Sequence, residues 1–281
     1  MAQTSVAKLE DYGLLRVAGE DARAFLHAQL SNDIEHLAQD QARLAGWCSA
    51  KGRLLATFLV VPSSAGFLLQ LARDLLPTVA KRLQMFVLRS KVKIADASGE
   101  WAQFGVWGTD GGAPYSVSER EGAIAVGIEP ERWLVLASAA ASARYVPNAP
   151  AQDWALAEIR AGRPLIGLAT QDQFVPQMVN LELAGGVDFH KGCYPGQEIV
   201  ARAQYRGAVK RRMVRLRGAA LRAGQELFSD DQPGQPGGTV VNAAGDELLA
   251  VVQTSALEGR SPIRAQPGAA PLEVLPLPYA P

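Results

Sequence analysis

The stretch DFHKGCYPGQEIVAR, residues 188–202, places a cysteine, a lysine and two glycines directly ahead of a short helical pattern. A proline and a glycine precede the segment QEIVARAQYR and Gly207 follows it, which predicts a short helix with the proline near its first position. Cys193 then lies just before a helix N-terminus, where the helix dipole, free amide donors and the nearby Lys191 favour a thiolate. The stretch therefore predicts an ionised, nucleophilic sulfur.

Two further patterns belong to the same stretch. Gly192 and Gly196 bracket the cysteine, which suits a tight backbone that passes close to a ligand or adopts positive φ. Glu198 falls in the first helical turn and Arg202 lies one turn later, so the two side chains can pair on the helix surface. Such an ion pair would give both residues a purely structural role, without any contact to a ligand.

A buried, inert thiol is the alternative interpretation of any lone cysteine. Cys48, at the head of a hydrophobic strand, fits that alternative. The neighbours of Cys193 are lysine, glycine, tyrosine and proline, which form no periodic apolar face. The pattern by itself leaves a functional and a structural Cys193 about equally supported.

The composition is that of a soluble globular protein, and the apolar runs and the N-terminal sequence lead us to expect it in the cytoplasm. The chain has 281 residues, enough for two or three domains, and 28 basic against 28 acidic residues, so its overall charge predicts no polyanionic partner. The longest apolar runs, such as LLATFLVV from Leu54, fall short of the roughly 18 to 20 residues that span a bilayer. The N-terminus shows no apolar segment behind a basic start. We therefore expect no membrane partner.

Cysteine and histidine spacing predicts no metal site and no disulfide framework. Cys48 and Cys193 are 145 residues apart, and no CxxC pair occurs. The three histidines, His27, His36 and His190, show no HxH or HxxxH arrangement.

The secondary-structure pattern predicts an α+β protein. A strand and a helix open the chain, Asp74 is expected to cap a second helix, and Asp153 to start a third that stops at Gly162. Short alternating runs between them predict mixed or antiparallel sheets rather than a Rossmann fold. The Pro- and Ala-rich segment 139–152 predicts a domain boundary. From Arg211 onward, short strands between Gly, Pro and Asp turns predict a small β-barrel or sandwich.

A basic stretch follows the cysteine. No acid occurs between Ile199 and Gln225, and this segment carries eight positive charges: Arg202, Arg206, Lys210, Arg211, Arg212, Arg215, Arg217 and Arg222. Such a patch could attract a phosphate backbone or a polycarboxylate ligand tail. The alternative is a solvated strand edge that its charges protect from aggregation.

Two aromatic residues are candidates for ligand contact. Tyr12 precedes the first strand and Trp154 starts its helix, and at such positions a ring can be half exposed to a planar ligand. Packing in the core or at its rim is the alternative.

The segment KGCYPGQEIVAR resembles the KGC(Y/F)xGQE signature of the YgfZ family of folate-binding proteins, relatives of the glycine cleavage T-protein and of mitochondrial iron–sulfur assembly factors. Further similar segments follow in consistent order along almost the whole chain: GEDARAFLHAQLSND at 19–33, AKGR at 50–53, ALAEIRAGRPLIG at 155–167, FVPQMVNLE at 174–182 and LPLPYAP at 275–281.

The resemblance implies a three-domain fold of the glycine cleavage T-protein type, with two ferredoxin-like α+β domains and a C-terminal β-barrel around a central channel. On this chain we expect residues 1–46 and 150–208 to form the first α+β domain, which carries the signature. Residues 47–149 are expected to form the second, and residues 209–281 the barrel.

The resemblance also implies tetrahydrofolate as the ligand and assigns roles to residues. The two folate-contacting aromatics fall on Tyr12, where a tryptophan is familiar, and on Trp154. The remaining roles come from the signature: Cys193 and Lys191 as the reactive groups, Gln197, Glu198 and Arg202 as ligand contacts, and Gly192 and Gly196 as backbone elements.

The implied role is support of the assembly or repair of iron–sulfur enzymes, including those that thiomethylate tRNA. A cluster usually needs four ligands, mostly thiolates, and this chain offers one candidate. We therefore expect Cys193 to act transiently, by bridging to a partner's cluster or by thiol chemistry, in an accessory factor rather than an enzyme. Its partners would be iron–sulfur enzymes or assembly proteins, with any link to tRNA indirect. The alternative is a tetrahydrofolate-dependent aminomethyl or methyl transferase.

Overall fold

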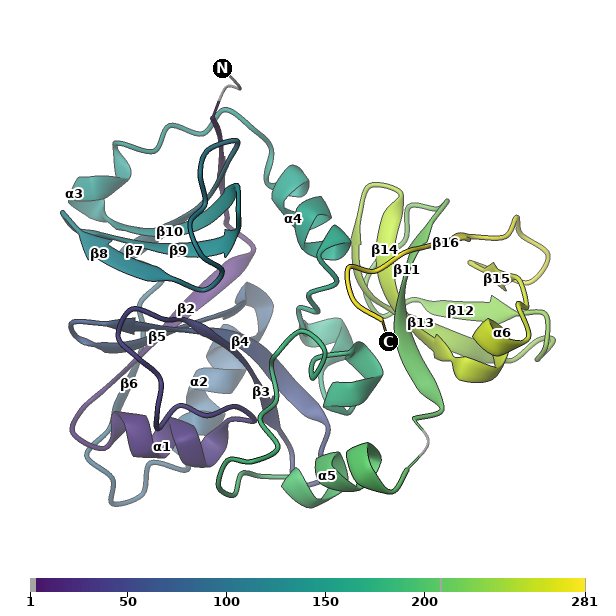
Figure 1. Ribbon diagram of the computed structural model, residues 1–281, viewed down its shortest axis with the longest axis horizontal. Coiled ribbons are helices and arrows are strands. Elements are labelled where there is room, and N and C mark those ends of the chain that lie inside the picture. Colours follow the sequence, from purple (N-terminus) through teal and green to yellow (C-terminus); the bar gives the residue numbers. More distant parts are fainter. Residues whose placement is uncertain (1–3, 208, 281) are drawn as a thin grey trace.

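Three antiparallel sheets and six α-helices make up the computed structural model, which describes residues 4–207 and 209–280 (Figure 1). The first sheet has the strand order β3 (Arg43–Cys48), β4 (Leu54–Ser63), β5 (Gly66–Ala72), β2 (Tyr12–Ala18) and β6 (Lys93–Asp96). The second has the order β1 (Ser5–Lys8), β7 (Trp101–Trp107), β10 (Arg132–Ser138), β9 (Ala123–Glu129) and β8 (Val117–Arg120).

The third sheet contains only strands that follow residue 210. Its order is β15 (Ile263–Arg264), β12 (Glu226–Ser229), β13 (Pro236–Ala244), β14 (Glu247–Gln253), β11 (Arg211–Arg217) and β16 (Glu273–Leu275). The α-helices are α1 (Ala22–Gln29), α2 (Leu76–Gln84), α3 (Ala139–Ser142), α4 (Ala151–Arg160), α5 (Gln197–Tyr205) and α6 (Thr254–Glu258). Three 3₁₀ turns are η1 (Arg73–Leu75), η2 (Leu168–Thr170) and η3 (Pro176–Val179).

Strand β4 explains how the first two sheets share a core. Its side chains alternate between two apolar clusters, as the two-residue period of a strand requires. Phe58 and Val60 pack in the cluster that α1 and α2 cover, whereas Leu59 and Val61 join a cluster with residues of β9 and β10. Burial on both faces accounts for the uninterrupted apolar run in this part of the sequence.

The sheets divide the chain differently from the expected boundary at residue 46. Strand β3 spans that position and pairs with β4, while β2 pairs with β5 over Tyr12↔Ala72 to Val17↔Phe67. The first sheet therefore draws strands from both sides of the expected boundary, because β2 supplies hydrogen-bonding partners to β5 and β6. Strand β1 joins the second sheet by pairing with β7.

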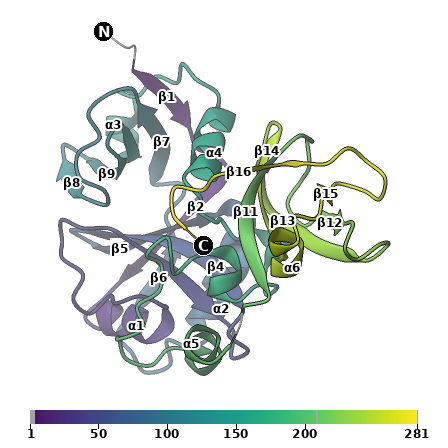
Figure 2. The same ribbon diagram turned by 45° about the vertical axis from the view of Figure 1, so that its right-hand side comes forward.

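Helix α4 lies between the second sheet and the third (Figures 1 and 2), and it contacts β1, β13 and β14. It begins at Ala151, two residues before the expected Asp153, and it ends before Gly162, which has a φ of +65° as expected of a helix stop. The hydroxyl of Tyr279 donates to the Gly162 carbonyl over 2.5 Å, so the C-terminal segment returns to this helix end.

The expected cap of the second helix is wrong. Helix α2 begins at Leu76, and the carboxylate of Asp74 accepts a hydrogen bond from the amide of Leu168 over 3.0 Å instead. Asp74 therefore ties η1 to η2 across 94 residues of sequence. Among the described residues, none of the helices is both long and apolar enough to cross a bilayer.

Candidate functional site

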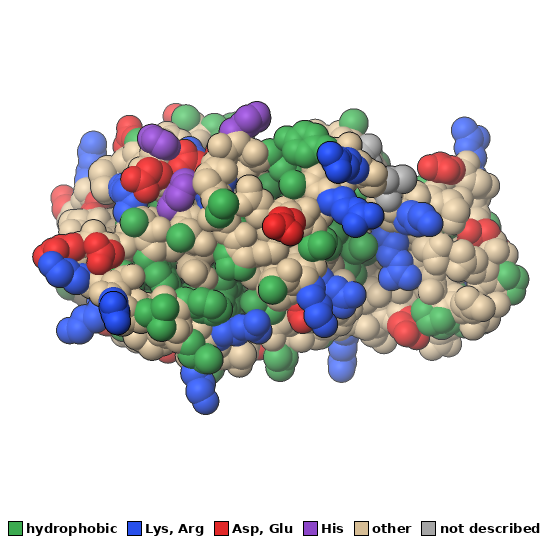
Figure 3. All heavy atoms as spheres, turned by 90° about the horizontal axis from the view of Figure 1, so that it is seen from below, with side chains coloured by type: hydrophobic (Ala, Val, Ile, Leu, Met, Phe, Trp, Pro, Cys, Tyr) green, Lys and Arg blue, Asp and Glu red, His purple; other side chains and the backbone are tan. Residues whose placement is uncertain are grey.

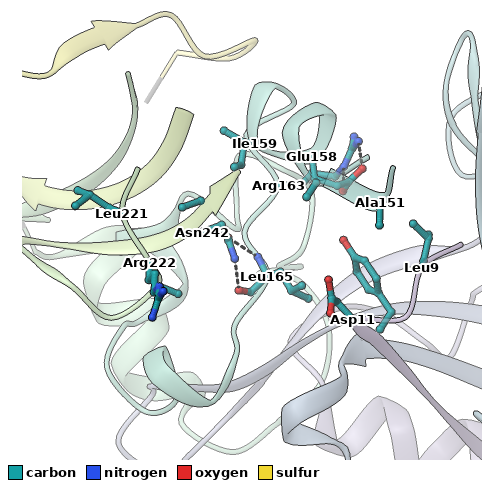
Figure 4. Close-up of a pocket in the computed structure, with 14 residues that line it drawn as sticks. Leu9, Asp11, Ala151, Glu158, Ile159, Arg163, Leu165, Leu221, Arg222 and Asn242 are labelled. Carbon is teal, nitrogen blue, oxygen red and sulfur yellow. Dashed lines mark hydrogen bonds and ion pairs between the residues drawn. The ribbon is translucent and has the colours of Figure 1, made fainter. Parts of the chain in front are cut away.

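A cavity of about 360 Å³ lies between the first sheet, helix α4 and the third sheet. Tyr12 comes from β2 of the first sheet, Glu158 from α4 and Asn242 from β13 of the third sheet, so two sheets and a helix contribute to its wall. Glu158 and Asn242 are labelled in Figure 4. The other lining residues are mainly apolar, with charged groups at Asp11, Arg163 and Arg222: Leu9, Asp11, Ala151, Ala155, Ile159, Arg163, Leu165, Leu221, Arg222, Ala223 and Ala243. The volume and the mostly apolar wall are those of a small-molecule site.

Two hydrogen bonds hold the third sheet against the loop that follows α4. The side-chain oxygen of Asn242 accepts from the Leu165 amide over 2.9 Å, and its side-chain nitrogen donates to the Leu165 carbonyl over 2.8 Å (Figure 4). Because the side chain both accepts from and donates to the backbone of one residue, the wall of the cavity is fixed at the point where the third sheet joins it.

A smaller compartment of about 60 Å³ adjoins the cavity and shares Tyr12, Glu158, Arg163 and Leu165 with it. Its further lining combines aromatic rings with polar side chains: Leu44, Thr57, Phe58, Leu59, Gln70, Tyr115, Ile128, Trp154 and Pro164. An apolar chamber therefore leads into a narrower space that offers both ring surfaces and hydrogen-bonding groups.

Tyr12 lies where the cavity meets the smaller compartment, and Trp154 lines the smaller compartment. Tyr12 is half-buried, as expected, and lines both compartments. Burial raises the pKa of its hydroxyl, and the nearby Glu158 carboxylate acts in the same direction. The phenol is therefore neutral at physiological pH and can donate a hydrogen bond to a ligand.

Trp154 is not half exposed, because it retains only 4% of its accessible surface. The Arg132 guanidinium lies 4.6 Å from the centroid of its ring. A Cβ atom added to Gly105 would sit 2.2 Å from the ring, so the backbone of β7 lies directly against the indole. The expectation of an exposed stacking surface is wrong: this tryptophan is part of the wall, held between a glycine and an arginine.

A network of four charged side chains fixes α4 to the second sheet. Arg163 contacts both Glu158 and Glu129, over 2.8 and 3.2 Å, and Arg132 contacts the same two carboxylates over 2.7 and 2.9 Å. Burial alone would raise the pKa of Glu158, but the two guanidiniums hold it at about 2. Glu158 is therefore ionised, and the two arginines balance its charge. Asp11 is the second carboxylate that lines the cavity.

The signature residues form a second region, built on α1, α5 and the turn at residues 49–52. Gly196, at a φ of +78°, precedes α5, and a Cβ atom there would lie 2.3 Å from the Ser49 carbonyl. Gly52, at a φ of +69°, packs in turn against Ile199. These contacts explain why the signature and the AKGR turn each need a glycine.

The two cysteines have opposite environments. Cys193 is exposed, whereas Cys48 is buried at the end of β3, where burial raises its pKa to about 12. Helix α5 begins at Gln197, the first residue of the predicted helical segment, and three residues separate Cys193 from the helix. The prediction that Cys48 is inert and buried agrees with the structure, and the exposed position of Cys193 is compatible with reactivity.

Lys191 is buried, and its ammonium donates to the carbonyls of His27 and Leu30 over 2.5 and 2.8 Å. Burial lowers its pKa to about 8, against the opposing effect of Asp33 and Asp188. At neutral pH the group therefore stays charged and is held by backbone oxygens.

The remaining signature residues lie on the first turns of α5. The side chain of Gln197 accepts from the Tyr194 amide over 3.3 Å, while Glu198 and Arg202 are both exposed. No ion pair joins Glu198 to Arg202 in the described part of the chain. None of the signature side chains lines the cavities described above, so the structure separates them from Tyr12 and Trp154.

The basic stretch is partly neutralised. Arg212 pairs with Glu182, and Arg215 and Arg217 pair with the buried Glu247. Four exposed basic residues from α5 to the start of β11 make no ion pair within residues 4–207 and 209–280: Arg202, Arg206, Lys210 and Arg211. Figure 3 shows Lys and Arg side chains gathered beside hydrophobic ones on this face of the molecule.

Curated relatives establish the family. The chain is 32% identical over 301 residues to the tRNA-modifying protein YgfZ of Klebsiella pneumoniae, which covers 97% of this chain and 92% of the relative. It is 32% identical over 308 residues to the protein of the same name from Serratia proteamaculans, with 98% and 92% covered. The chain belongs to the YgfZ family. A scan against protein-family models gave no match.

The fold expected of a YgfZ protein is confirmed by a solved structure. The glycine cleavage system aminomethyltransferase T from Bartonella henselae superposes with a TM-score of 0.72, at 16% sequence identity, over 90% of this chain and 79% of that one. At this identity the likeness concerns the fold alone. It supports the T-protein-like arrangement of three sheets.

Sequence reasoning missed most of the cavity of this YgfZ chain. Asn242 lines the cavity, whereas Arg132 and Glu129 lie outside it and form ion pairs with its wall residues Glu158 and Arg163. Each of the three lies in a strand whose sequence predicts only a strand. Glu158 and Arg163 flank the end of a predicted helix, five residues apart, and that spacing is the one local signal that could have suggested an ion pair.

Proposed function

We propose that this YgfZ family member binds a tetrahydrofolate in the central cavity and supports the assembly or repair of iron–sulfur enzymes, including those that thiomethylate tRNA. Cys193 is the functional thiol in this proposal. The observation that carries it is the exposure of Cys193 on a surface loop, while the second cysteine is buried.

The cavity suits the shape of a folate. A planar, hydrogen-bonding head group fits the junction at Tyr12, beside the polar groups of Gln70 and Tyr115, and an apolar linker fits the wider chamber. Arg222 lines the cavity near its exposed side and can attract the carboxylates of the tail. Bound tetrahydrofolate would supply a carrier for one-carbon units.

A titration of tetrahydrofolate, followed by intrinsic fluorescence, tests the ligand. We expect Tyr12→Ala to weaken binding by at least about tenfold, because it removes both a ring and a hydroxyl at the junction. Tyr205→Ala is the matched control, since Tyr205 is an exposed tyrosine on α5 outside the cavity. Absence of binding to the unmodified protein, or equal affinity in the two variants, would exclude this site.

A folate-dependent one-carbon transferase is the second candidate. The observation that favours it is Asp11, a carboxylate that lines the cavity beside Tyr12 and has no ion pair in the described chain. An aminomethyl-transfer assay discriminates between the candidates. Turnover that Asp11→Asn abolishes would establish the transferase, whereas absence of turnover in a folate-binding protein would favour the accessory role.

We propose that the protein acts on tRNA only indirectly, through the enzymes that modify tRNA. The four unpaired basic residues near α5 are the feature that a direct contact would use. Filter binding of tRNA at increasing salt tests this, because a phosphate interface weakens steeply as salt rises. Salt-sensitive binding that a combined Arg202→Ala and Arg206→Ala variant removes would contradict the indirect route.

A further inference from the structure

We propose that Lys191 is a positioning residue, whose ammonium fastens the Cys193 loop to the C-terminal end of α1, and that it takes no part in chemistry at the thiol. The inference rests on the proposed function only in taking Cys193 as the functional group. It differs from the role expected from the signature, in which Lys191 reacts alongside the cysteine.

The Lys191 ammonium lies at the C-terminal end of α1. Helix α1 ends at Gln29, and its last carbonyls have no amide partner within the helix. Lys191 reaches two carbonyls at this end, those of His27 and Leu30. A cation at a helix C-terminus is also favoured by the helix dipole. The lysine therefore caps α1 from a loop that lies more than 160 residues further along the chain.

The N–H donors of the Lys191 ammonium bind mainly to the backbone. A lysine has three donors and no acceptor. Two donors are committed to the backbone carbonyls, and the ring of Tyr194 covers the group, with its centroid 4.9 Å from Nζ. Lys191 is buried, two of its three donors bind backbone carbonyls and an aromatic ring lies beside the group, so its contacts are those of a cation that holds the fold.

Backbone and packing contacts also fasten the rest of the loop beside α1. The Asp188 amide donates to the Ser31 carbonyl over 2.9 Å, just past the end of α1. Gly192 lies against the imidazole of His27, so that a Cβ atom there would be 3.4 Å from Nε2. Tyr194 is buried on the far side of the cysteine. Cys193 is thus an exposed side chain, like His190, on a loop that is fastened on both sides.

The charged surroundings fit a structural cation. Asp33, Asp188 and, as the smallest effect, the Cys193 thiol are the acidic groups that act on Lys191, and Asp33 also contacts His27 and His36 over 3.2 and 2.8 Å. Figure 3 shows histidine and acidic side chains gathered on this face of the molecule. Removal of the lysine charge would leave this group of acids and helix carbonyls without their buried cation.

Amide hydrogen exchange at pH 7, read peptide by peptide, tests the proposal. In Lys191→Met we expect exchange to accelerate at least about tenfold over residues 27–31 and 188–194, with the core strands β4 and β14 unchanged, because two charge-assisted hydrogen bonds are lost. Lys191→Arg keeps the charge and should restore part of the protection. Lys51→Met is the matched control, since Lys51 is exposed in the neighbouring turn.

Complementation of a deletion strain, scored by iron–sulfur enzyme activity, supplies the functional readout. In Lys191→Met we expect both iron–sulfur enzyme activity and the protection of the loop amides to decrease. In Lys191→Arg we expect both to recover in part. Loss of function with unchanged loop exchange in either folded variant would overturn the proposal and make Lys191 a reactive group. If Lys191→Met does not fold, Lys191→Arg alone decides between these outcomes.

The same data separate this inference from the proposed function. Full activity of Cys193→Ala would remove the functional thiol but would leave the exchange result for Lys191→Met intact. Unchanged exchange in Lys191→Met, together with an inactive Cys193→Ala, would overturn only the positioning role.

Discussion

The guanidinium of Arg132 lies 4.6 Å from the centroid of the Trp154 ring, on a face of the indole that a stacked ligand would need. Gly105 lies directly against the same ring. A residue expected to offer a ring to folate is therefore a buried part of the wall, and the half-buried Tyr12 is the aromatic group that meets the cavity.

Trp154→Ala should therefore act mainly on stability. Removal of a buried tryptophan from between Gly105 and Arg132 should lower the free energy of unfolding by about 3 to 5 kcal/mol. Urea unfolding measures this, and Tyr12→Ala, at a half-buried ring, is the comparison with a smaller expected loss. A Trp154→Ala variant of normal stability but weakened folate affinity would favour direct contact.

Glu158→Gln tests the charged network at the cavity. The carboxylate has its pKa lowered to about 2, so it stabilises the fold fully above its unfolded value near 4.5, and this contribution is lost as the pH falls from 4.5 towards 2. At pH 7 the substitution should cost about 3 kcal/mol, because it leaves two buried guanidiniums without that charge. Unfolding curves from pH 7 to pH 3 should show the difference from the unmodified protein shrinking; a constant difference would contradict the assignment.

Gly196→Ala and Gly185→Ala form a matched pair for the signature backbone. Both glycines have nearly the same positive φ, +78° and +77°, but an added Cβ meets the Ser49 carbonyl at 2.3 Å in the first and nothing within 4 Å in the second. The positive φ should lower the free energy of unfolding by about 1 kcal/mol in each alanine variant, and only Gly196→Ala adds a clash with the backbone. Thermal unfolding should show a clearly larger loss for Gly196→Ala, and equal losses would show that the turn can move aside.

Cys193 and Cys48 should differ sharply in their reaction with a thiol reagent. In the native protein one equivalent should react quickly, at the exposed Cys193, while Cys48 should react only on unfolding, because it is buried and its pKa is raised to about 12. Peptide mapping after a brief pulse of iodoacetamide identifies the modified residue. Rapid native labelling of Cys48 would show that β3 opens readily.

The sequence predicted what depends on local pattern. The apolar run of β4, the glycine that ends α4 and the burial of Cys48 follow from composition and turn chemistry, which act over a few residues. The T-protein-like fold came from resemblance, which draws on the order of segments along the whole chain.

Long-range partners could not be predicted in the same way. Nothing near Trp154 in the sequence indicates that Arg132 and Gly105 enclose it, and nothing near Lys191 indicates the carbonyls of α1. The boundary at residue 46 failed for a related reason, because strand pairing between β2 and β5 is set by tertiary hydrogen bonds rather than by distance along the chain.

Complementation of a deletion strain with Cys193→Ala, beside Cys48→Ala as the control, tests the central claim most directly. Iron–sulfur enzyme activity and tRNA thiomethylation are the readouts, in cells that contain equal amounts of each variant. We predict that Cys48→Ala restores both activities and that Cys193→Ala restores neither. Full restoration by Cys193→Ala would contradict this prediction.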